Sequence, residues 1–576
     1  MKLFKINPKK FNRMVKLVKF AFIGIAVLLL FQMIRLQIFD FEQLKEKALQ
    51  MRTKKAQVFR GEIFDRNGLK LAADATVYDI YAHPHYYRED ETPEDVARLL
   101  APILKMNITK LEEKLKQNFS TISIAKGIDR DRALQIRKLK LSSISSPERT
   151  VRYYPQGDLA SHILGYVNPD AKLAAGVEKT GSGFVENVKS KILQKDGHGR
   201  VIFDFGTNAE EISKPIKGQK LTLTIDSAIQ HVAEKELGKM IDATDAQKGT
   251  VIVMNPKNGE ILAMAVAPSY NPNEYNKYSY STVKNWVLTD VYPPGSTFKI
   301  LTVASALNTG KMNPYDTVYD DGSIKIQGWK IDNYDVRKNP KPGNIDLSYL
   351  LEHSSNVGSV KVALKMTPSE FHNQISKFGI GSKTGIDLPG ESSGILHPAS
   401  SWDTITQATI SFGYSLAATP IQMASAVATI ANDGVWVTPH VIKYPEEIAE
   451  KKLEKRQVIT PETAKTMRKL LEGSIRNSKS IAGKIPNFTV AGKTGTARKP
   501  NPKGTGYLTG VVYTSFAAFF PATNPEILIM VVVDSPKGAE VWGSTVAGPV
   551  FNEVATFVTR YLNMKPDAPG LNVKKR

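Results

Sequence analysis

The chain has 576 residues, 42% of them hydrophobic and 23% charged, a composition that is typical of folded globular proteins and excludes general disorder. It contains no cysteine, which excludes disulfide bonds, cysteine-ligated zinc, iron–sulfur clusters and a thiol nucleophile. The formal net charge is +21, and residues 1–60 alone hold 14 Lys and Arg against 3 Asp and Glu. Because this charge flanks an apolar segment and follows no nucleic-acid-binding motif, it predicts a membrane protein with no nucleic-acid partner.

The first expected element is a single membrane-spanning helix at residues 17–38. Fifteen uncharged residues end before Arg35, which gives about 22 Å of helix, and Lys16, Lys19 and Arg35 can lengthen it by reaching the membrane surface. Seven Lys or Arg and no acidic residue precede the run, so the positive-inside rule predicts a cytoplasmic tail at residues 1–16. No small-x-small cleavage site follows. We therefore expect an uncleaved anchor in the cell inner (plasma) membrane, with the rest of the chain outside the cytoplasm, and not a signal peptide.

Residues 39–215 are expected to form a stalk and an N-terminal pedestal domain. Within them, residues 40–56 are predicted to be a charged helix and residues 93–117 a polar helical stretch. Short apolar runs alternate with polar stretches elsewhere, which favours a mixed α+β domain. The closest pair of histidines, His83-Pro84-His85, lacks the spacing of zinc ligands and is interpreted as a solvated loop.

A second domain is expected at residues 216–563, followed by a C-terminal tail at 564–576. Asp226 is the expected N-cap of a helix that continues to Leu237. Strands are expected at both ends of the domain, with a largely helical block between them and one helix after the last strand. This pattern predicts one antiparallel sheet completed by distant segments and flanked by helices, an α/β-type fold. The strands are predicted at 221–225, 250–254, 261–266, 489–491, 511–520 and 527–533, the helical block at 296–480, and the last helix at 549–561.

The first chemical motif is Ser296-x-x-Lys299, which follows the helix-breaking sequence Pro293-Pro294-Gly295. Ser296 is therefore expected at a helix N-terminus, where free backbone N–H groups can bind an anion. Lys299 lies one turn further along the same face, and it can deprotonate Ser296 if its own pKa is lowered enough to make it neutral. Two other Ser-x-x-Lys sequences, at Ser123 and Ser281, lack the helix signals. The arrangement suits nucleophilic acyl transfer.

The second motif is Ser354-x-Asn356, 58 residues after Ser296. Its hydroxyl and amide can bridge Lys299 and an amide of a substrate. The alternative is that this Ser/Asn cluster only caps a helix, and a second Ser-x-Asn sequence occurs at Ser269.

The third motif is Lys493-Thr494-Gly495-Thr496, on a predicted strand. The lysine and the two hydroxyls can hold a substrate carboxylate, and the glycine would leave room for substrate to lie against the strand. A backbone N–H beyond the glycine can face an oxyanion. A second Lys-Thr-Gly sequence, at Lys383, lies in a glycine-rich loop and is interpreted as structural.

In this order, the three motifs resemble the active-site set of penicillin-binding proteins and β-lactamases, and the Ser-Ser-Asn form is closer to the former. Further stretches resemble class B penicillin-binding proteins, and most of all the septal, division-specific (FtsI-type) proteins, with the elongation-specific type as the nearest competitor. These stretches are residues 60–68, 165–167, 176–178, 223–226, 384–391 and 412–414. One position departs from the family pattern: Ser415 stands where the family often has glycine.

The resemblance implies a β-lactamase/transpeptidase-like domain on an elongated, dimerisation-like pedestal, and a peptidoglycan D,D-transpeptidase that cross-links stem peptides during septal cell-wall synthesis. Ser296 would be acylated by a stem peptide ending in D-Ala-D-Ala, or by a β-lactam, and Lys299 would be the base. Ser354 and Asn356 would relay protons and position the peptide. The further partners would be a membrane glycosyltransferase and other division proteins, and no metal or cofactor is implied.

By the same resemblance, Lys493, Thr494 and Thr496 would grip the terminal carboxylate, beside Gly495. The backbone N–H groups of Ser296 and Thr496 would form the oxyanion hole. A β-lactamase or penicillin sensor is disfavoured by the long pedestal, and a non-catalytic scaffold is disfavoured because every motif position is filled.

Overall fold

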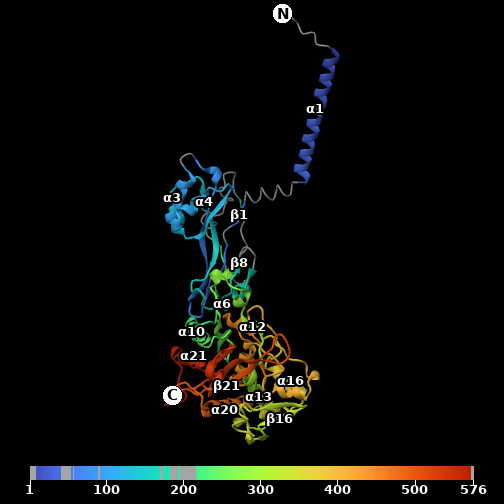
Figure 1. The fold of residues 1–576 in the computed structure, drawn as a ribbon, viewed down its shortest axis with the longest axis vertical. Coiled ribbons are helices and arrows are strands. Elements are labelled where there is room, and N and C mark those ends of the chain that lie inside the picture. The colour runs from blue at the N-terminus through green and yellow to red at the C-terminus, as the bar shows by residue number, and fades with distance from the viewer. Residues whose placement is uncertain are drawn as a thin grey trace. The chain divides into compact units, whose positions relative to one another are not determined.

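The computed structural model of the protein describes residues 8–39, 53–55, 58–88, 91–168, 173–181, 192–194 and 216–571. Two compact units make up the chain, and each is described by itself. The first comprises residues 1–60 and 187–218, and the second comprises residues 61–186 and 219–576. Figure 1 shows the helices and strands coloured by residue number.

The first unit contains the N-terminal helix α1 (Pro8–Ile34), which continues into a π-helical turn, Arg35–Phe39. The segment Asn12–Gln37 has a mean hydropathy of 2.4 and is long and apolar enough to cross a membrane. The anchor predicted at residues 17–38 lies within this helical run.

The helix predicted at residues 40–56 falls largely outside the described residues. Its described part, β1 (Thr53–Lys55), is a strand that pairs antiparallel with β10 (Ile192–Gln194), so the helix prediction is wrong there. The pairing partner is distant in sequence, which local helix propensity does not anticipate. In the same unit, β2 (Val58–Phe59) pairs parallel with β11 (Ile216–Lys217).

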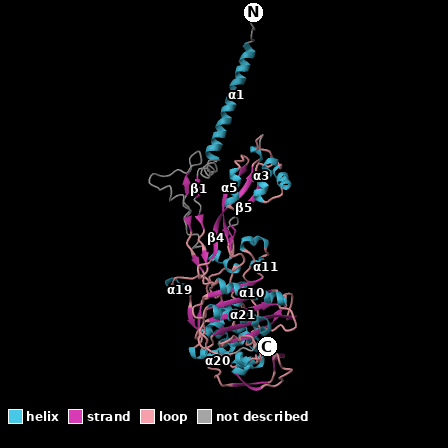
Figure 2. Ribbon diagram, turned by 90° about the vertical axis from the view of Figure 1, so that its left-hand side faces the viewer, coloured by secondary structure: helices cyan, strands magenta, loops and turns pink. Residues whose placement is uncertain are grey.

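The pedestal is built around one long strand, β4 (Lys70–Ala82) (Figure 2). It pairs antiparallel with four shorter strands: β3 (Ile63–Phe64), β5 (Ile122–Ile128), β6 (Ile144–Ser145) and β7 (Glu148–Tyr153). The helices are α3 (Pro93–Leu104), α4 (Ile108–Leu115), α5 (Arg130–Lys138), α6 (Ser161–Leu164) and α7 (Gly176–Thr180), and β8 (Val167–Asn168) pairs with β9 (Leu173–Ala174). The stretch predicted as helical at 93–117 is divided because Lys105 has a left-handed φ of 53° and Asn107 caps a new helix.

A buried arginine joins three segments of the pedestal. Arg152 donates to Glu178 (2.6 Å), to Asp74 (3.0 Å) and to the carbonyl oxygen of Gly61 (2.9 Å). All three charged side chains are at most 5% exposed. Removing one partner would leave a buried charge uncompensated. The cluster therefore holds together β4, β7 and α7, which carry Asp74, Arg152 and Glu178.

The domain expected at residues 216–563 is organised on a five-stranded antiparallel sheet in the order β14-β13-β23-β22-β21. This confirms the predicted sheet completed by distant segments. The strands are β13 (Lys248–Met254), β14 (Ile261–Ala267), β21 (Ala491–Pro500), β22 (Tyr507–Phe520) and β23 (Ile527–Asp534). Pedestal strand β3 also pairs, in parallel, with β12 (Leu221–Thr222), so the two parts share one body.

The sheet is buried on both faces. Alternate residues of β13 belong to two different hydrophobic clusters: Val251 and Val253 pack with α10 (Ser227–Thr244) and α21 (Gly548–Tyr561), whereas Ile252 packs with the helical block. The predicted cap is confirmed, since the Asp226 carboxylate accepts from the N–H groups of the first turn of α10.

The block between the sheet halves is largely helical, as predicted, but it also contains three two-stranded sheets. Its helices are α13 (Lys299–Asn308), α14 (Leu347–Glu352), α15 (Asn356–Ala363), α16 (Pro368–Lys377), α17 (Thr404–Ile410), α18 (Pro420–Ala431), α19 (Glu446–Lys452) and α20 (Pro461–Asn477); the short α11 (Tyr280–Val283) and α12 (Trp286–Thr289) precede it. The strand pairs are β15 (Thr317–Asp320) with β18 (Gly343–Asp346), β16 (Ser323–Ile326) with β17 (Trp329–Asp332), and β19 (Val435–Val437) with β20 (Lys455–Gln457).

Candidate active site

Ser296 lies in a 3-10 turn, Gly295–Phe298, that runs directly into α13. The expectation of a helix start is therefore confirmed, with a tighter first turn. Gly295 has a φ of 57°, and a Cβ there would lie 2.9 Å from the Cβ of Ala497 on β21. Only glycine accommodates both the left-handed backbone and this close approach, which brings the Ser296 turn against the edge strand.

Lys299 is fully buried and lies at the centre of the polar cluster. Its Nζ is 3.2 Å from Ser296 Oγ, 3.1 Å from Ser354 Oγ and 2.8 Å from Asn356 Oδ1. It also donates to the Ser354 carbonyl oxygen at 2.6 Å. The structure thus brings together the four side chains that the first two motifs supply.

Burial lowers the pKa of Lys299 well below its ordinary value, and the nearby Lys493 ammonium lowers it further, while Asp320 opposes the shift. A lysine in this environment loses its proton far more easily than one in water. Its neutral amine can then accept the proton of the Ser296 hydroxyl.

The Ser-x-Asn motif forms the corner between α14 and α15. Ser354 has a left-handed φ of 55°, and Ser355 caps α15, with its Oγ accepting from the N–H of Gly358 at 2.7 Å. The helix-capping alternative is therefore correct for Ser355, whereas Ser354 and Asn356 face Lys299. The left-handed backbone at Ser354 aims both its hydroxyl and its carbonyl oxygen at the amine.

At this corner, two substitutions should differ in their effect on stability but have the same effect on activity. Ser354→Gly and Ser354→Ala both remove the hydroxyl, but only glycine adopts a positive φ without strain, so Ser354→Gly should have the higher free energy of unfolding, by about 1 kcal/mol. Acylation by a fluorescent penicillin should fall in both by about 10²-fold or more. Thermal unfolding and labelling kinetics measure the two effects. Equal stability of the two variants would contradict the proposed strain.

The Lys-Thr-Gly motif lies on β21, at the end of the sheet. Lys493 is 4% exposed, and burial lowers its pKa to about 8. Thr496 Oγ1 accepts from the N–H of Gly543 at 3.0 Å. The Arg498 N–H donates outward to Tyr414 Oη at 2.9 Å, so by the alternation of an antiparallel strand the N–H groups of Thr494 and Thr496 also point outward. This edge can pair with an extended peptide.

Gly495 is also required by close packing within the protein. A Cβ at this position would lie 2.5 Å from Ser515 Oγ, 3.0 Å from Thr297 Cγ2 and 3.2 Å from the Pro294 carbonyl oxygen. The missing side chain therefore makes room for the neighbouring strand and the Ser296 turn. The absence of a side chain at residue 495 lets β21, which carries Lys493, lie close to the turn that carries Ser296.

The second Lys-Thr-Gly sequence, at residues 383–385, lies in a loop and not on a strand. Thr384 donates through its N–H and its hydroxyl to the Glu391 carboxylate (2.6 and 2.5 Å), and the Gly385 N–H donates to the other oxygen of Glu391 at 3.1 Å. Lys383 is exposed on this loop. The carboxylate holds the turn closed, which agrees with a structural role.

Ser415, which departs from the family pattern, has a left-handed φ of 57°. Its hydroxyl lies 2.7 Å from that of Thr409. The glycine-favouring backbone is therefore kept, and Ser415→Gly should change the free energy of unfolding by less than about 1 kcal/mol, because relief of strain offsets the lost contact. Ser415→Val should destabilise by about 1–2 kcal/mol or more in the same chemical denaturation experiment. Equal effects would argue against the left-handed geometry.

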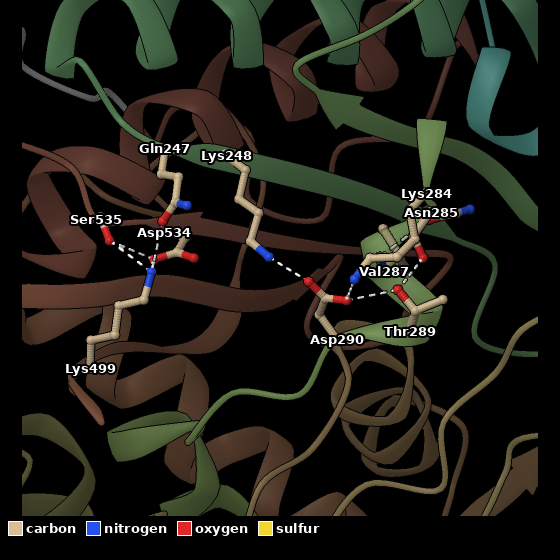
Figure 3. Close-up of polar contacts among 10 residues, drawn as sticks. All are labelled: Gln247, Lys248, Lys284, Asn285, Val287, Thr289, Asp290, Lys499, Asp534 and Ser535. Atoms are coloured by element: carbon tan, nitrogen blue, oxygen red, sulfur yellow. Dashed lines mark hydrogen bonds and ion pairs between the residues drawn. The ribbon is translucent and has the colours of Figure 1, made fainter. Parts of the chain in front are cut away.

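Two ion-pair networks hold the segments that carry the site (Figure 3). Asp290, shortly before Ser296, accepts from Lys248 at 2.6 Å and from Lys284 at 2.5 Å. Lys499, near the end of β21, pairs with the buried Asp534 at 2.6 Å. Both networks tie chain segments of the site to the central strands of the sheet.

Two residues outside the three sequence motifs lie behind Asn356. They are Asp320, at the end of β15, and Asn333, just after β17, and both are buried. Neither belongs to a short motif, so no spacing signal could have found them. Among the residues that the structure describes, no group of three or more His, Asp or Glu is placed to hold a metal ion.

Comparison with known proteins agrees with this architecture. The family described as the penicillin binding protein transpeptidase domain matches residues 249–556, and that described as the penicillin-binding protein dimerisation domain matches residues 55–223. Stage V sporulation protein D of Bacillus subtilis is 33% identical over 533 residues, 90% of this chain and 79% of that protein. Peptidoglycan D,D-transpeptidase FtsI of Escherichia coli is 30% identical over 524 residues, 90% of this chain and 86% of that protein.

Among solved structures, a peptidoglycan synthetase from Bifidobacterium adolescentis superposes with a TM-score of 0.67 at 27% identity. The match covers 90% of this chain and 98% of that one. The similarity therefore extends over the pedestal as well as the sheet domain.

Proposed function

The chain belongs to the class B penicillin-binding proteins and is a peptidoglycan D,D-transpeptidase, and from this premise we propose that it acts through an acyl-enzyme on Ser296 at the division septum. The observation that carries the chemistry is the 3.2 Å contact between Lys299 Nζ and Ser296 Oγ, made by an amine whose pKa is lowered mainly by burial. This pair supplies a nucleophile and its base.

In the first half-reaction, Ser296 Oγ attacks the carbonyl carbon of the penultimate D-alanine, and its proton passes to Lys299. The peptide bond to the terminal D-alanine then breaks, and the leaving nitrogen takes a proton through Ser354, whose hydroxyl is 3.1 Å from Lys299 Nζ. In the second half-reaction, an amine of another stem peptide attacks the carbonyl carbon of the Ser296 ester, and the bond from that carbon to Ser296 Oγ breaks. The proton that the amine loses passes to Ser296 Oγ through Lys299, whose Nζ is 3.2 Å away. The product is a cross-link between two stem peptides.

The substrate is held on the other side of the site by β21. Lys493 with Thr494 and Thr496 would bind the terminal carboxylate of the stem peptide, or the equivalent carboxylate of a β-lactam. The backbone N–H groups of Ser296 and Thr496 would stabilise the oxyanion of the tetrahedral intermediate. The outward N–H groups of the edge strand support an extended substrate lying along it.

The septal role and the membrane location rest on different support. The apolar helix α1, with seven basic residues ahead of its uncharged run, supports a single-pass anchor in the plasma membrane with a cytoplasmic N-terminus. The septal role is supported by relatives named FtsI, although a relative named for sporulation is similarly close. A membrane glycosyltransferase and other division proteins would be the partners there.

Depletion combined with imaging of a tagged copy tests the role. We expect filaments or unseparated cells, and label concentrated at midcell. Rounded cells with label along the side wall would assign it to elongation, and a defect confined to sporulation would assign it there. A mature N-terminus mapped downstream of Ile38 would overturn the anchor.

The rate of deacylation separates the remaining functions. A transpeptidase stays labelled by penicillin, whereas a β-lactamase releases it, and a silent scaffold is not labelled. Purified protein chased with unlabelled penicillin distinguishes the three outcomes.

A further inference from the structure

Asp320 is a buried carboxylate that the Ser-Lys chemistry leaves unexplained. It is fully buried at the end of β15. Its oxygens accept from the Gly322 N–H (2.7 Å), from Asn333 Nδ2 (2.9 Å) and from Ser355 Oγ (2.5 Å). Burying a carboxylate is costly unless its oxygens are filled by donors, and here they are.

Asn333 continues the network towards the site. While its Nδ2 donates to Asp320, its Oδ1 accepts from the backbone N–H groups of Asn356 (2.8 Å) and Val357 (3.1 Å). These are the first N–H groups of α15, which have no partner within the helix itself. Asn333 therefore fixes the backbone at the residue whose side chain contacts Lys299.

Ser355 provides the second connection. Its hydroxyl donates to Asp320 and accepts from the Gly358 N–H, so the cap of α15 is locked between the carboxylate and the helix. Ser355 lies between Ser354 and Asn356 in sequence, and both neighbours contact Lys299 Nζ. Two separate connections thus lead from Asp320 to the groups around the amine.

We propose that Asp320 and Asn333 are positioning residues of the acylation site, holding Ser354 and Asn356 against Lys299 through Ser355 and the first turn of α15. This inference deepens the proposed function and rests on it. Neither residue touches the substrate or the reacting atoms. They act through the side chains that do.

The network also has an electrostatic consequence. The charged groups that face Lys299 are Lys493, from β21, and Asp320, from β15. Burial and Lys493 lower the pKa of Lys299, and the Asp320 carboxylate raises it. Removing the Asp320 charge should therefore lower the pKa of Lys299. Because acylation requires the neutral amine, the acid limb of the pH–rate profile should then move to lower pH.

The test compares Asp320→Asn, Asn333→Ala and the control Asp321→Asn in the full-length protein. Asp321 neighbours Asp320 in sequence, but its half-exposed side chain pairs with Lys361 at 2.8 Å. We expect acylation by a fluorescent penicillin to fall about ten- to a hundredfold in the first two variants and to be unchanged in the control. Only Asp320→Asn should shift the acid limb, because Asn333 carries no charge.

The outcomes are distinguishable. If the unsubstituted protein is not acylated on Ser296, the proposed function fails. If it is acylated and both Asp320→Asn and Asn333→Ala react at its rate with its pH profile, the positioning role is wrong while the proposed function stands. Circular dichroism checks folding, and if Asp320→Asn does not fold, an unchanged rate in folded Asn333→Ala is enough to overturn the inference.

Discussion

Replacing Lys299 by methionine should reduce the rate of acylation by a fluorescent penicillin by about 10²- to 10⁴-fold, the range expected for loss of a general base. Methionine keeps the unbranched shape of the side chain in a fully buried position, so the loss reflects the missing amine and not a cavity. Lys299→Arg should be equally inactive, because a guanidinium stays protonated and cannot accept the Ser296 proton. Stopped-flow fluorescence with the purified protein measures the rate.

The matched control is Lys361→Met, which removes a partly exposed lysine of α15 that pairs with Asp321. It should react at the unsubstituted rate. In the unsubstituted protein, acylation should increase as the pH rises through the pKa of Lys299, because only the neutral amine is a base. A folded Lys299→Met variant that reacts within tenfold of the unsubstituted rate would show that another group takes the proton.

Lys493→Ala should slow acylation about ten- to a hundredfold, because it removes a buried, charge-assisted contact with the substrate carboxylate, worth about 1.5–3 kcal/mol. Lys383→Ala, in the second Lys-Thr-Gly sequence, should leave the rate nearly unchanged, since that lysine is exposed on a structural loop. The same labelling assay measures both. The reverse ranking would mean that the carboxylate binds at the other sequence.

The pH dependence of acylation gives a second test of the role of Lys493. Burial lowers the pKa of Lys493 to about 8, so its ammonium is present below that pH and is lost above it. Acylation of the free protein should therefore decline above a pH of about 8, and this alkaline limb should disappear in Lys493→Ala. The acid limb should move to higher pH, because the Lys493 charge no longer lowers the pKa of Lys299. An alkaline limb that survives the substitution would assign it to another group.

The sequence predicted four strands of the main sheet, β13, β14, β22 and β23, because each contains a long apolar run, whereas β21 is largely polar and was predicted only at its first residue. Val251 and Ile252 are both buried, on opposite faces of the sheet. The strand is therefore apolar at consecutive positions and does not alternate between apolar and polar residues. Asp226 was predictable as a cap from its position before an amphipathic run. Ser296, Lys299, Ser354 and Lys493 could be predicted as site residues because each lies in a short motif with a chemical reason for its spacing.

The features that could not be predicted from the sequence share a physical cause. Each depends on contacts between distant parts of the chain. Strand β1 at Thr53–Lys55 forms through its pairing with residues 192–194. The close packing at Gly495 involves Ser515 and Pro294, which are far away in sequence. Asp320 and Asn333 are isolated polar residues whose role appears only when β15 and β17 are folded against α15.

Peptide mass spectrometry of the penicillin-labelled protein tests the central claim most directly. We predict a single adduct, on Ser296, because this serine alone among the three Ser-x-x-Lys sequences follows a glycine turn and contacts a buried lysine. Ser123 and Ser281 should remain unmodified, and Ser296→Ala should abolish the adduct. An adduct on either of those serines, or one retained by folded Ser296→Ala, would contradict the account.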